Sequence, residues 1–266
     1  MKKILCMLFS VCMLFSVCAC GSSENSPSES TEKKEYVNDS EIKNVFDNPR
    51  DYTGKYIRLT GQVFNTVTDK ETVLQVWHDT KNSNEDFVVT APSSETFDND
   101  DYIIVDGKIT GEFTGENAFG AKISSPQIEA IKIEKSTYQD VVAPTLSSKD
   151  VNLSSTQHKI TFTVEKVEFA ENETRVYVKV KNDSNASVSL YCSSSAKAIQ
   201  DGKQIKISDD SYEANYKDIQ EVASGASDDG IICFAKMDST KPFTLIQEAY
   251  SDDYNIEMKD FKIEVK

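Results

Sequence analysis

The stretch GKYIRLTGQV, residues 54–63, decides the fold of the first half of the chain, because DDYIIVDGKI at residues 100–109 repeats its pattern. Aligning the two stretches matches three identical residues: Tyr56 with Tyr102, Ile57 with Ile103, and Gly61 with Gly107. Apolar and polar residues alternate in both, which predicts strands with one buried face. A glycine inside a strand marks a bulge or a tight bend. We therefore expect two long strands that bend at Gly61 and Gly107, as a small closed barrel requires.

The same alternation predicts a barrel of five strands over residues 39–136. The expected strands are Tyr56–Thr68, Thr72–Trp77, Asp86–Thr90, Tyr102–Phe113 and Lys122–Glu134. Before them, EIKNVFDN has helical spacing; Ser40 is expected to cap this helix and Pro49 to end it. Five strands of which the first and fourth are long indicate an OB-like barrel. The helix usual between its third and fourth strands is expected to be reduced or absent, because SSETFDNDD is short and rich in turn residues.

This first half also resembles a known family. DYTGKYIRLTGQVF, followed by DDYIIVDGKITGEFTGENAFGAKISSPQIEAIKIE, is similar to the anticodon-binding-like OB domains of lipoproteins from Gram-positive bacteria. The resemblance covers about residues 40–136 and implies the OB fold. It carries no established reaction.

The second half predicts a β-sandwich after a linker. Residues 137–157 mix Ser, Thr, Pro and Asp without a sustained period and are interpreted as the linker. Over 158–266, short alternating runs are separated by turn residues, the pattern of a sandwich. In TRVYVKVKN at 174–182, Val176, Val178 and Val180 share one face, and Arg175, Tyr177, Lys179 and Lys181 share the other. Further strands are expected at 188–200, 204–207, 230–237, 243–250 and 256–265.

A second resemblance covers about residues 150–266. HKITFTVEKVEFAENETRVYVKVKNDSN, with AKAIQDGKQ and GIICFAKM, resembles the telokin-like, immunoglobulin-type domains of exported Gram-positive proteins, most of which have no known role. The Cys…Trp…Cys core of antibody domains is absent, since the single Trp, Trp77, lies in the first half. The expected fold class is thus all-β, an OB-like barrel followed by an immunoglobulin-like β-sandwich.

The N-terminus predicts export and a lipid anchor. Lys2 and Lys3 precede the apolar run ILCMLFSVCMLFSVCA, so residues 1–19 have the pattern of a signal peptide. The run is short for a membrane span, which needs about 20 apolar residues. VCAC at 17–20 resembles the bacterial lipobox, which implies a lipidated Cys20, carrying palmitate, on the extracytoplasmic face of the cell membrane. An ordinary signal peptide and an uncleaved anchor helix are the alternatives.

Residues 20–38 are expected to be a flexible tether, because GSSENSPSESTEKKE contains no apolar residue. Removal of Lys2 and Lys3 from the 29 basic residues leaves 27 against 44 acidic ones, a net charge of −17. Such a chain is repelled by phosphate backbones and by anionic lipid surfaces. The expected partners are the membrane, through the lipid anchor, and an unknown envelope protein or small ligand, and no nucleic acid.

No motif points to catalysis, a metal or a cofactor. His78 and His158 lie in different predicted domains, and the sequence has no HExxH, GxSxG or phosphate-loop motif. The acidic clusters lack the ligand pattern of an EF-hand loop. The leading interpretation is a non-catalytic binding or interaction module. The alternative is a cell-envelope enzyme that acts on glycan or peptide.

Two further sets of residues are singled out. Cys192 and Cys233 are expected either to form a disulfide or to be two small buried side chains. In TVLQVWHD, alternation directs Leu74 and Val76 into the barrel, so Gln75 and Trp77 lie on its outer face. OB barrels bind ligands across strands 2 and 3 and the adjoining loops. Gln75, Trp77 and Phe119, in the loop before the fifth strand, are therefore the candidate ligand-binding residues. In the alternative, Trp77 packs against the N-terminal helix or the second domain and Phe119 closes the barrel end.

Overall fold

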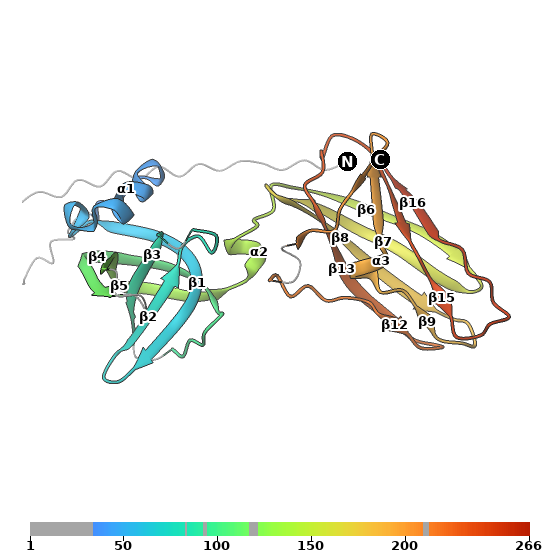
Figure 1. The fold of residues 1–266 in the computed structure, drawn as a ribbon, viewed down its shortest axis with the longest axis horizontal. Helices are drawn as coiled ribbons and strands as arrows, with labels where there is room; N and C mark the ends of the chain where they lie inside the picture. Colours follow the sequence, from blue (N-terminus) through green and yellow to red (C-terminus); the bar gives the residue numbers. More distant parts are fainter. Residues whose placement is uncertain (1–33, 83, 93–94, 117–121, 210–212) are drawn as a thin grey trace, which may run out of the picture. The chain divides into compact units, whose positions relative to one another are not determined.

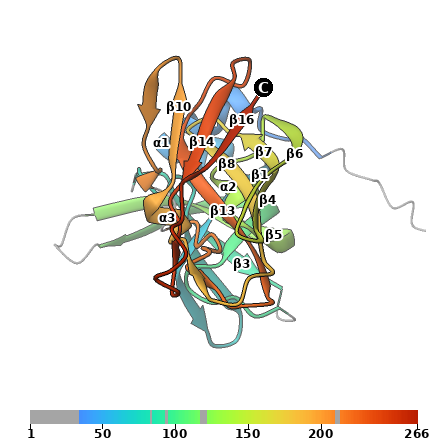
Figure 2. The same cartoon turned by 90° about the vertical axis from the view of Figure 1, so that its right-hand side faces the viewer.

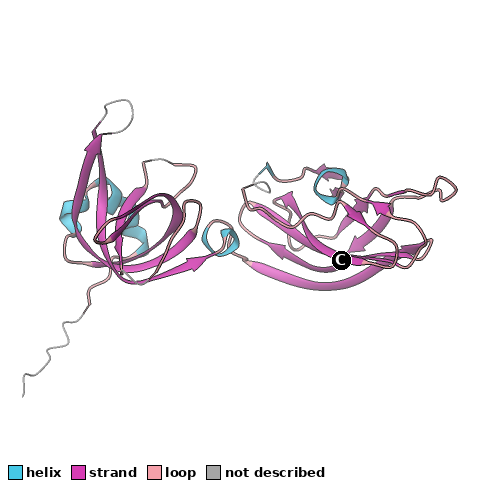
Figure 3. Ribbon diagram, turned by 90° about the horizontal axis from the view of Figure 1, so that it is seen from below, coloured by secondary structure: helices cyan, strands magenta, loops and turns pink. Residues whose placement is uncertain are grey.

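The fold is built almost entirely from strands, so the all-β class is confirmed (Figures 1 and 3). The computed structural model describes residues 34–266 except 83, 93–94, 117–121 and 210–212. The predicted signal peptide, Cys20, most of the predicted tether and Phe119 lie outside the described residues. Within the described part, the first five strands and the later strands form separate sheets.

The first five strands close into a barrel in the order β1-β2-β3-β5-β4 (Figure 1). They are β1 (Tyr56–Thr68), β2 (Thr72–Trp77), β3 (Asp86–Ala91), β4 (Tyr102–Glu116) and β5 (Lys122–Ser136). All neighbours pair antiparallel except β3 and β5, which are parallel. The predicted bounds agree with these to within three residues at every end. The described residues between β3 and β4 contain no helix, as expected.

The two repeated stretches are hydrogen-bonded to each other. In the antiparallel ladder between β1 and β4, Ile57 lies opposite Gly107, and Gly61 lies opposite Ile103. Antiparallel pairing reverses one copy against the other, so each glycine faces the isoleucine of the other copy. The repeat therefore reflects two adjacent strands that meet the same steric requirement from opposite directions.

At each glycine the strand on its outer side, away from the β1–β4 ladder, approaches closely: β2 at Gly61 and β5 at Gly107. A Cβ at Gly61 would lie 2.6 Å from Val76 Cγ1, and closer still to the carbonyl oxygen of Trp77. At Gly107 it would lie 2.5 Å from Ile128 Cγ2. The β4–β5 register shifts next to Gly107, in agreement with the predicted bend. At Gly61 the β1–β4 ladder is regular, so no bulge lies there, and the irregularity of β1 lies between Val63 and Asn65.

Alternate residues of the five strands fill the barrel. Its fully buried side chains include Ile57, Leu59, Val63, Leu74, Val76, Phe87, Val89, Ile103, Val105, Ile109 and Ile128. Each such side chain contributes about 1.5–3 kcal/mol relative to an exposed one. The helix α1 (Ile42–Asp47) adds Val45 and Phe46 to the same cluster.

The start of the described chain corrects two expectations. A 3-10 turn, η1 (Asp39–Glu41), precedes α1, and neither helix has a side-chain N-cap, so Ser40 does not cap the predicted helix. A second turn, η2 (Pro49–Tyr52), follows. Attachment to the barrel also begins before the predicted tether boundary at residue 38. Tyr36 forms a bridge with Tyr56, and its hydroxyl donates to Asp106 at 2.9 Å.

The remaining strands form three sheets, seen in Figures 1 and 2. One four-stranded sheet has the order β13-β8-β7-β6, a second β11-β10-β14-β16, and a three-stranded sheet β12-β9-β15. The bounds are β6 Ser147–Gln157, β7 Ile160–Phe169, β8 Glu173–Asn182, β9 Val188–Ser189, β10 Lys197–Gln200, β11 Lys203–Ile205, β12 Glu221–Val222, β13 Ser227–Ala235, β14 Phe243–Gln247, β15 Tyr250–Ser251 and β16 Phe261–Val265. Side chains from all three sheets share one core, among them Phe162, Val178, Val188, Phe234 and Leu245.

Several segments differ from expectation. The strand predicted at 256–265 begins only at Phe261, and the strand predicted at 243–250 ends at Gln247. The predicted linker contains a short helix, α2 (Tyr138–Val141), and its second half is strand β6. β6 pairs only with β7 and is mostly exposed, which explains why its sequence lacks a clear apolar period. The predicted strand at 188–200 is broken by the helical turn α3 (Cys192–Ser195). Tyr191, in the left-handed region at φ 50°, turns the chain into α3.

Candidate functional site

Strand β2 has the predicted orientation. Leu74 and Val76 are fully buried inside the barrel. Gln75 and Trp77 alternate with them and are partly exposed on the outer face. The two candidate ligand-binding residues in the described part therefore lie side by side on one surface of the barrel.

The ring of Trp77 stacks on Phe64 of β1. The centroids are 4.5 Å apart and the planes differ by 20°. Phe64 occupies the irregularity of β1: the register passes from Val63 opposite Val76 to Asn65 opposite Gln75, which leaves Phe64 as an extra residue. A bulge of this kind redirects a side chain, and here it brings a second aromatic ring to Trp77.

This stack differs from the alternative in which Trp77 packs against the N-terminal helix. In the described structure, Phe46 of α1 stacks on His78 instead, with centroids 5.3 Å apart. The Nδ1 atom of His78 lies 2.8 Å from the carbonyl oxygen of Thr60. His78 is thus held by the barrel wall and α1, and Trp77 has its ring partner in the neighbouring strand.

Amide side chains surround the aromatic pair. Gln62 lies opposite Trp77, and Asn65 lies opposite Gln75. Asn65 donates from Nδ2 to Oε1 of Gln75 at 3.0 Å, which orients both amides. Across β3 the row continues through Val88, which pairs with Gln75 on one side and with Gln127 of β5 on the other. An amide can both donate and accept hydrogen bonds.

One carboxyl group adjoins the aromatic pair. Asp86 of β3 pairs with Trp77 and accepts a hydrogen bond from Ser125 Oγ at 2.9 Å. Burial raises the pKa of Asp86 above its usual value, and the hydrogen bond from Ser125 opposes this effect only in part. Within the described residues, no Lys or Arg forms an ion pair with Asp86.

These residues form what we call the Trp77 face, defined by Gln62, Phe64, Asn65, Gln75, Trp77, Asp86, Val88 and Gln127. It combines two partly exposed rings with four amides and one carboxyl group, and it contains no basic residue. Of these residues, Gln75 and Trp77 were predicted from the sequence. Phe64 and Asn65 were not, because a bulge changes which side chains face outward. Asp86 was not, because only β2–β3 pairing places it beside Trp77.

The two cysteines of the second half are free and buried. Cys192 is in α3 and Cys233 is in β13. Burial raises the pKa of both thiols, because an apolar surrounding disfavours the thiolate. Of the two alternatives that the sequence left open, the structure therefore contains two buried thiols and no disulfide between them.

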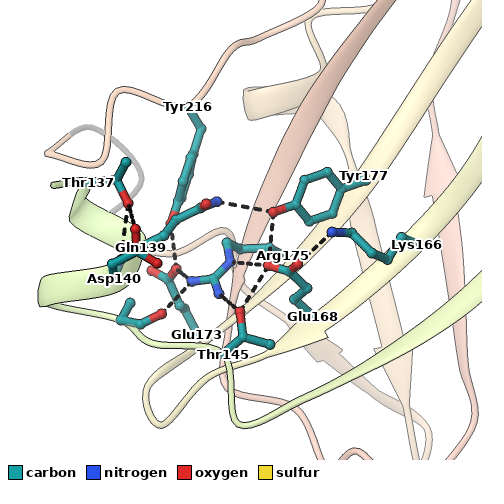
Figure 4. A network of polar contacts seen from close by, with 11 residues as sticks. Thr137, Gln139, Asp140, Thr145, Lys166, Glu168, Glu173, Arg175, Tyr177 and Tyr216 are labelled. Atoms are coloured by element: carbon teal, nitrogen blue, oxygen red, sulfur yellow. Dashed lines mark hydrogen bonds and ion pairs between the residues drawn. The ribbon is translucent and has the colours of Figure 1, made fainter.

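A second polar cluster, which the sequence analysis did not identify, surrounds Arg175 of β8 (Figure 4). Arg175 was expected on the exposed face of its strand, yet its side chain is fully buried. Its guanidinium donates to Glu173 at 2.6 Å, to the carbonyl oxygen of Ala143 at 2.7 Å, to Thr145 at 2.7 Å and to Glu168 at 3.2 Å. Residues from the predicted linker thus complete the shell of a buried cation.

The cluster extends through two tyrosines and a lysine. The hydroxyl of Tyr216 donates to Glu173 at 2.7 Å, and that of Tyr177 donates to Glu168 at 2.9 Å. Lys166 donates to Glu168 at 2.6 Å. Burial disfavours the charged guanidinium, but the hydrogen bond to Glu173 and the charge of that carboxylate help to outweigh this and raise the pKa of Arg175. Most polar atoms of the cluster bind one another, so it is suited to hold chain segments together rather than to take a ligand.

Two features are absent from the described residues: a metal-binding cluster and a helix able to cross a bilayer. No group of three or more His, Cys, Asp or Glu residues there is placed to hold a metal ion. Across the same residues, no helix has the length and apolar character that crossing a bilayer requires.

Comparison of the chain with protein-family models, with curated proteins and with solved structures found no match.

Proposed function

We propose that this protein is a non-catalytic binding protein of the cell envelope, anchored by a lipid on Cys20 to the extracytoplasmic side of the membrane. In this proposal the barrel is an OB-type barrel and the later sheets form an immunoglobulin-like sandwich. The Trp77 face takes the ligand, an envelope component or a small molecule. The basic and apolar start of the sequence and the lipobox-like VCAC support the anchor.

The observation that carries the proposal is the Phe64–Trp77 stack on the outer face of the barrel. Large aromatic side chains contribute most when buried, yet both rings remain partly exposed. They are flanked by amides that can still accept or donate further hydrogen bonds. A few polar groups beside an apolar surface are the usual composition of a ligand site.

The strand order supports the choice of face. The described barrel has five strands in the order β1-β2-β3-β5-β4, and a five-stranded OB barrel binds ligands across strands 2 and 3. Trp77 and Gln75 are on β2, and Asp86 is on β3. The fold and the side chains thus favour the same surface independently.

The Trp77 face favours binding over glycan cleavage. Glycoside hydrolysis generally uses two carboxyl groups on either side of the bond. Asp86 is the single carboxyl group of the face, and its neighbours there are rings, amides and Val88. This composition supports recognition without bond cleavage.

The binding face is tested by the retention of the purified full chain on cell envelopes. The envelopes are first stripped of lipid with detergent, and the chain is kept soluble in detergent during the measurement. Trp77→Ala should lower retention at least tenfold. Tyr254→Ala, which removes a fully exposed ring from the second half, should leave it unchanged. Thermal unfolding of each variant checks that the fold persists. Equal retention of the native chain and of a folded Trp77→Ala chain would overturn the proposed face.

The anchor has its own test. Cys20→Ala should abolish palmitate incorporation and release the chain from the membrane fraction. A Cys20→Ala chain that remained labelled and membrane-bound would show that the anchor lies elsewhere.

A further inference from the structure

We propose that the ligand of the Trp77 face is a neutral glycan, an inference that rests on the binding function proposed above. Three properties of the face carry it: the shape of the aromatic surface, the kind of hydrogen-bonding groups around it, and its charge. Each restricts the chemistry of the ligand separately.

The two rings are stacked face to face. The Phe64 and Trp77 rings are within 20° of parallel, so they form one stacked pair and do not enclose a cage. Each ring covers one face of the other, and both side chains remain partly exposed. A flat ring face suits the C–H face of a pyranose sugar, whereas an aromatic cage is the usual receptor for an organic cation.

The flanking groups match hydroxyls. Gln62, Asn65, Gln75 and Gln127 are amides, each able to donate and to accept. A sugar hydroxyl also does both, so a row of amides meets a row of hydroxyls without leaving either side unpaired. Asp86 adds an acceptor at the edge of Trp77. Oriented amides such as Asn65 and Gln75, fixed by their mutual bond of 3.0 Å, reduce the ordering cost of binding.

Charge excludes the anionic alternatives. The Trp77 face has no Lys or Arg, and the chain without Lys2 and Lys3 has the net charge of −17 given above. Phosphate and carboxylate polymers require cations for attraction. A cationic ligand would be drawn to Asp86, but that carboxyl group already accepts from Ser125 and is partly desolvated. A neutral polyhydroxylated ligand satisfies the face with no unpaired charge.

The extent of the face favours an oligosaccharide. The row from Asn65 through Gln75 and Val88 to Gln127 crosses four adjacent strands; its three amides are partly exposed, and Val88 between them is only 3% exposed. With strands about 4.8 Å apart, the row spans about 14 Å. This length accommodates more than one pyranose ring.

The experiment uses the single tryptophan as a reporter, because Trp77 is the only Trp in the chain. The full chain, in a detergent without a sugar headgroup, is titrated with four probes: a tetramer of glucose, a tetramer of N-acetylglucosamine, a tetramer of galacturonate and tetralysine. At least one neutral tetramer should change the fluorescence of Trp77 saturably. The galacturonate tetramer should bind at least tenfold more weakly, and tetralysine should give no saturable change.

A matched pair of variants ties the binding to the face. Gln75→Ala should weaken the neutral tetramer at least fivefold while keeping the Trp77 reporter. Gln204→Ala, at an exposed position of β11, should have no effect. Thermal unfolding confirms that both variants fold. Equal affinity of folded Gln75→Ala and native chain would overturn the assignment.

The remaining outcomes separate this inference from the proposed function. If Trp77→Ala lowers envelope retention but neither neutral tetramer binds, the glycan inference fails and the binding face stands. Saturable binding of tetralysine that weakens with salt would replace the glycan with a cationic ligand. Equal binding of neutral and galacturonate tetramers would overturn the selectivity for neutral sugars. If a neutral tetramer binds the chain and releases it from the envelope, both proposals are supported.

Discussion

The Trp77 face and the Arg175 cluster are both polar sites on β-strands. They differ in how many of their polar groups have hydrogen-bond partners within the protein. The Arg175 guanidinium is fully buried and donates to four groups of the protein. The amides of the Trp77 face have few protein partners, and its two rings are partly exposed. A polar cluster that is internally paired holds the fold together, whereas one with free donors and acceptors is available to a ligand.

The difference arises from the number of segments that converge. The Arg175 cluster gathers groups from β7, from β8, from the 139–145 segment and from Tyr216 (Figure 4), and the Arg175 side chain is fully buried. The Trp77 face lies on one side of a single sheet. The other side of that sheet is the barrel core, and on the outer side every residue of the face except Val88 is partly exposed.

The largest effect is expected from Arg175→Met. The substitution leaves Glu173 buried without its cation, and removal of one member of a buried ion pair costs about 3–5 kcal/mol. Unfolding in denaturant measures the free energy. Lys179→Met on the exposed side of the same strand is the matched control and should change stability by less than about 0.5 kcal/mol. Similar losses for the two variants would show that the cluster is no more important than the surface.

The second largest loss of stability is expected at Gly61, beneath the Trp77 face. Gly61→Val places side-chain atoms against Val76 and the Trp77 carbonyl, and should cost about 1–3 kcal/mol by overpacking. Gly115→Val is the control, because an added Cβ there meets only side-chain atoms of Phe113 and Ile123. Because β2 must shift, Gly61→Val should also change the emission of Trp77. Unchanged stability and emission would contradict the close approach of β1 and β2.

A smaller effect with a clear pH dependence is expected at Glu168. Burial alone would raise the pKa of Glu168, but hydrogen bonds from Lys166 and Tyr177 outweigh it and lower the pKa. A lowered pKa means that the carboxylate stabilises the fold above its ordinary pKa of 4.5 and loses this contribution as the pH falls through its folded value. Glu168→Gln should thus cost on the order of 1 kcal/mol at pH 7.

The measurement is the stability difference between the native chain and Glu168→Gln from pH 7 to pH 3. The difference should shrink below pH 4.5 as the native carboxylate takes up a proton. A difference that stayed constant over this range would show that charge at Glu168 contributes nothing.

The smallest effect, of opposite sign, is expected at Asp86. Its pKa is raised by burial, so the charged carboxylate disfavours the folded state above its folded pKa, and this penalty disappears below the ordinary value of 3.8. Asp86→Asn, which keeps an acceptor for Ser125, should stabilise the protein slightly at pH 7 and have no effect at pH 3. Denaturant unfolding at both pH values measures it. A loss of stability at pH 7 would mean that the Trp77 face is held together by its charge, as the Arg175 cluster is.

Much of the barrel was predictable because its information is local. Alternation in β1, β2 and β4, and glycines within the strands, identified the elements to within a few residues. The orientation of Leu74, Val76 and Trp77 followed from the same period of two. The proposed export signal is also a local pattern, since it depends on the order of basic, apolar and small residues near Cys20, and it stays a prediction.

Other features depended on pairing between distant segments. β6 has few apolar residues and becomes a strand because β7 supplies its hydrogen bonds. Ser40 has the composition of a cap, but the chain enters α1 through a 3-10 turn instead. The period that placed Val176 and Val178 correctly also placed Arg175 outside, because alternation cannot show that another segment covers that side.

The sequence by itself therefore determined the strands of the barrel, their buried faces and the sites where glycine is required, because these follow from backbone sterics and the burial of apolar side chains. Only the tertiary structure decided which polar residues gather. The bulge that brings Phe64 to Trp77 is defined by register with β2. The burial of Arg175 is defined by Ala143 and Thr145, which lie about thirty residues away along the chain. Hydrogen bonds and ring contacts act over a few ångströms in space, so residues distant in sequence meet only when the whole fold brings them together.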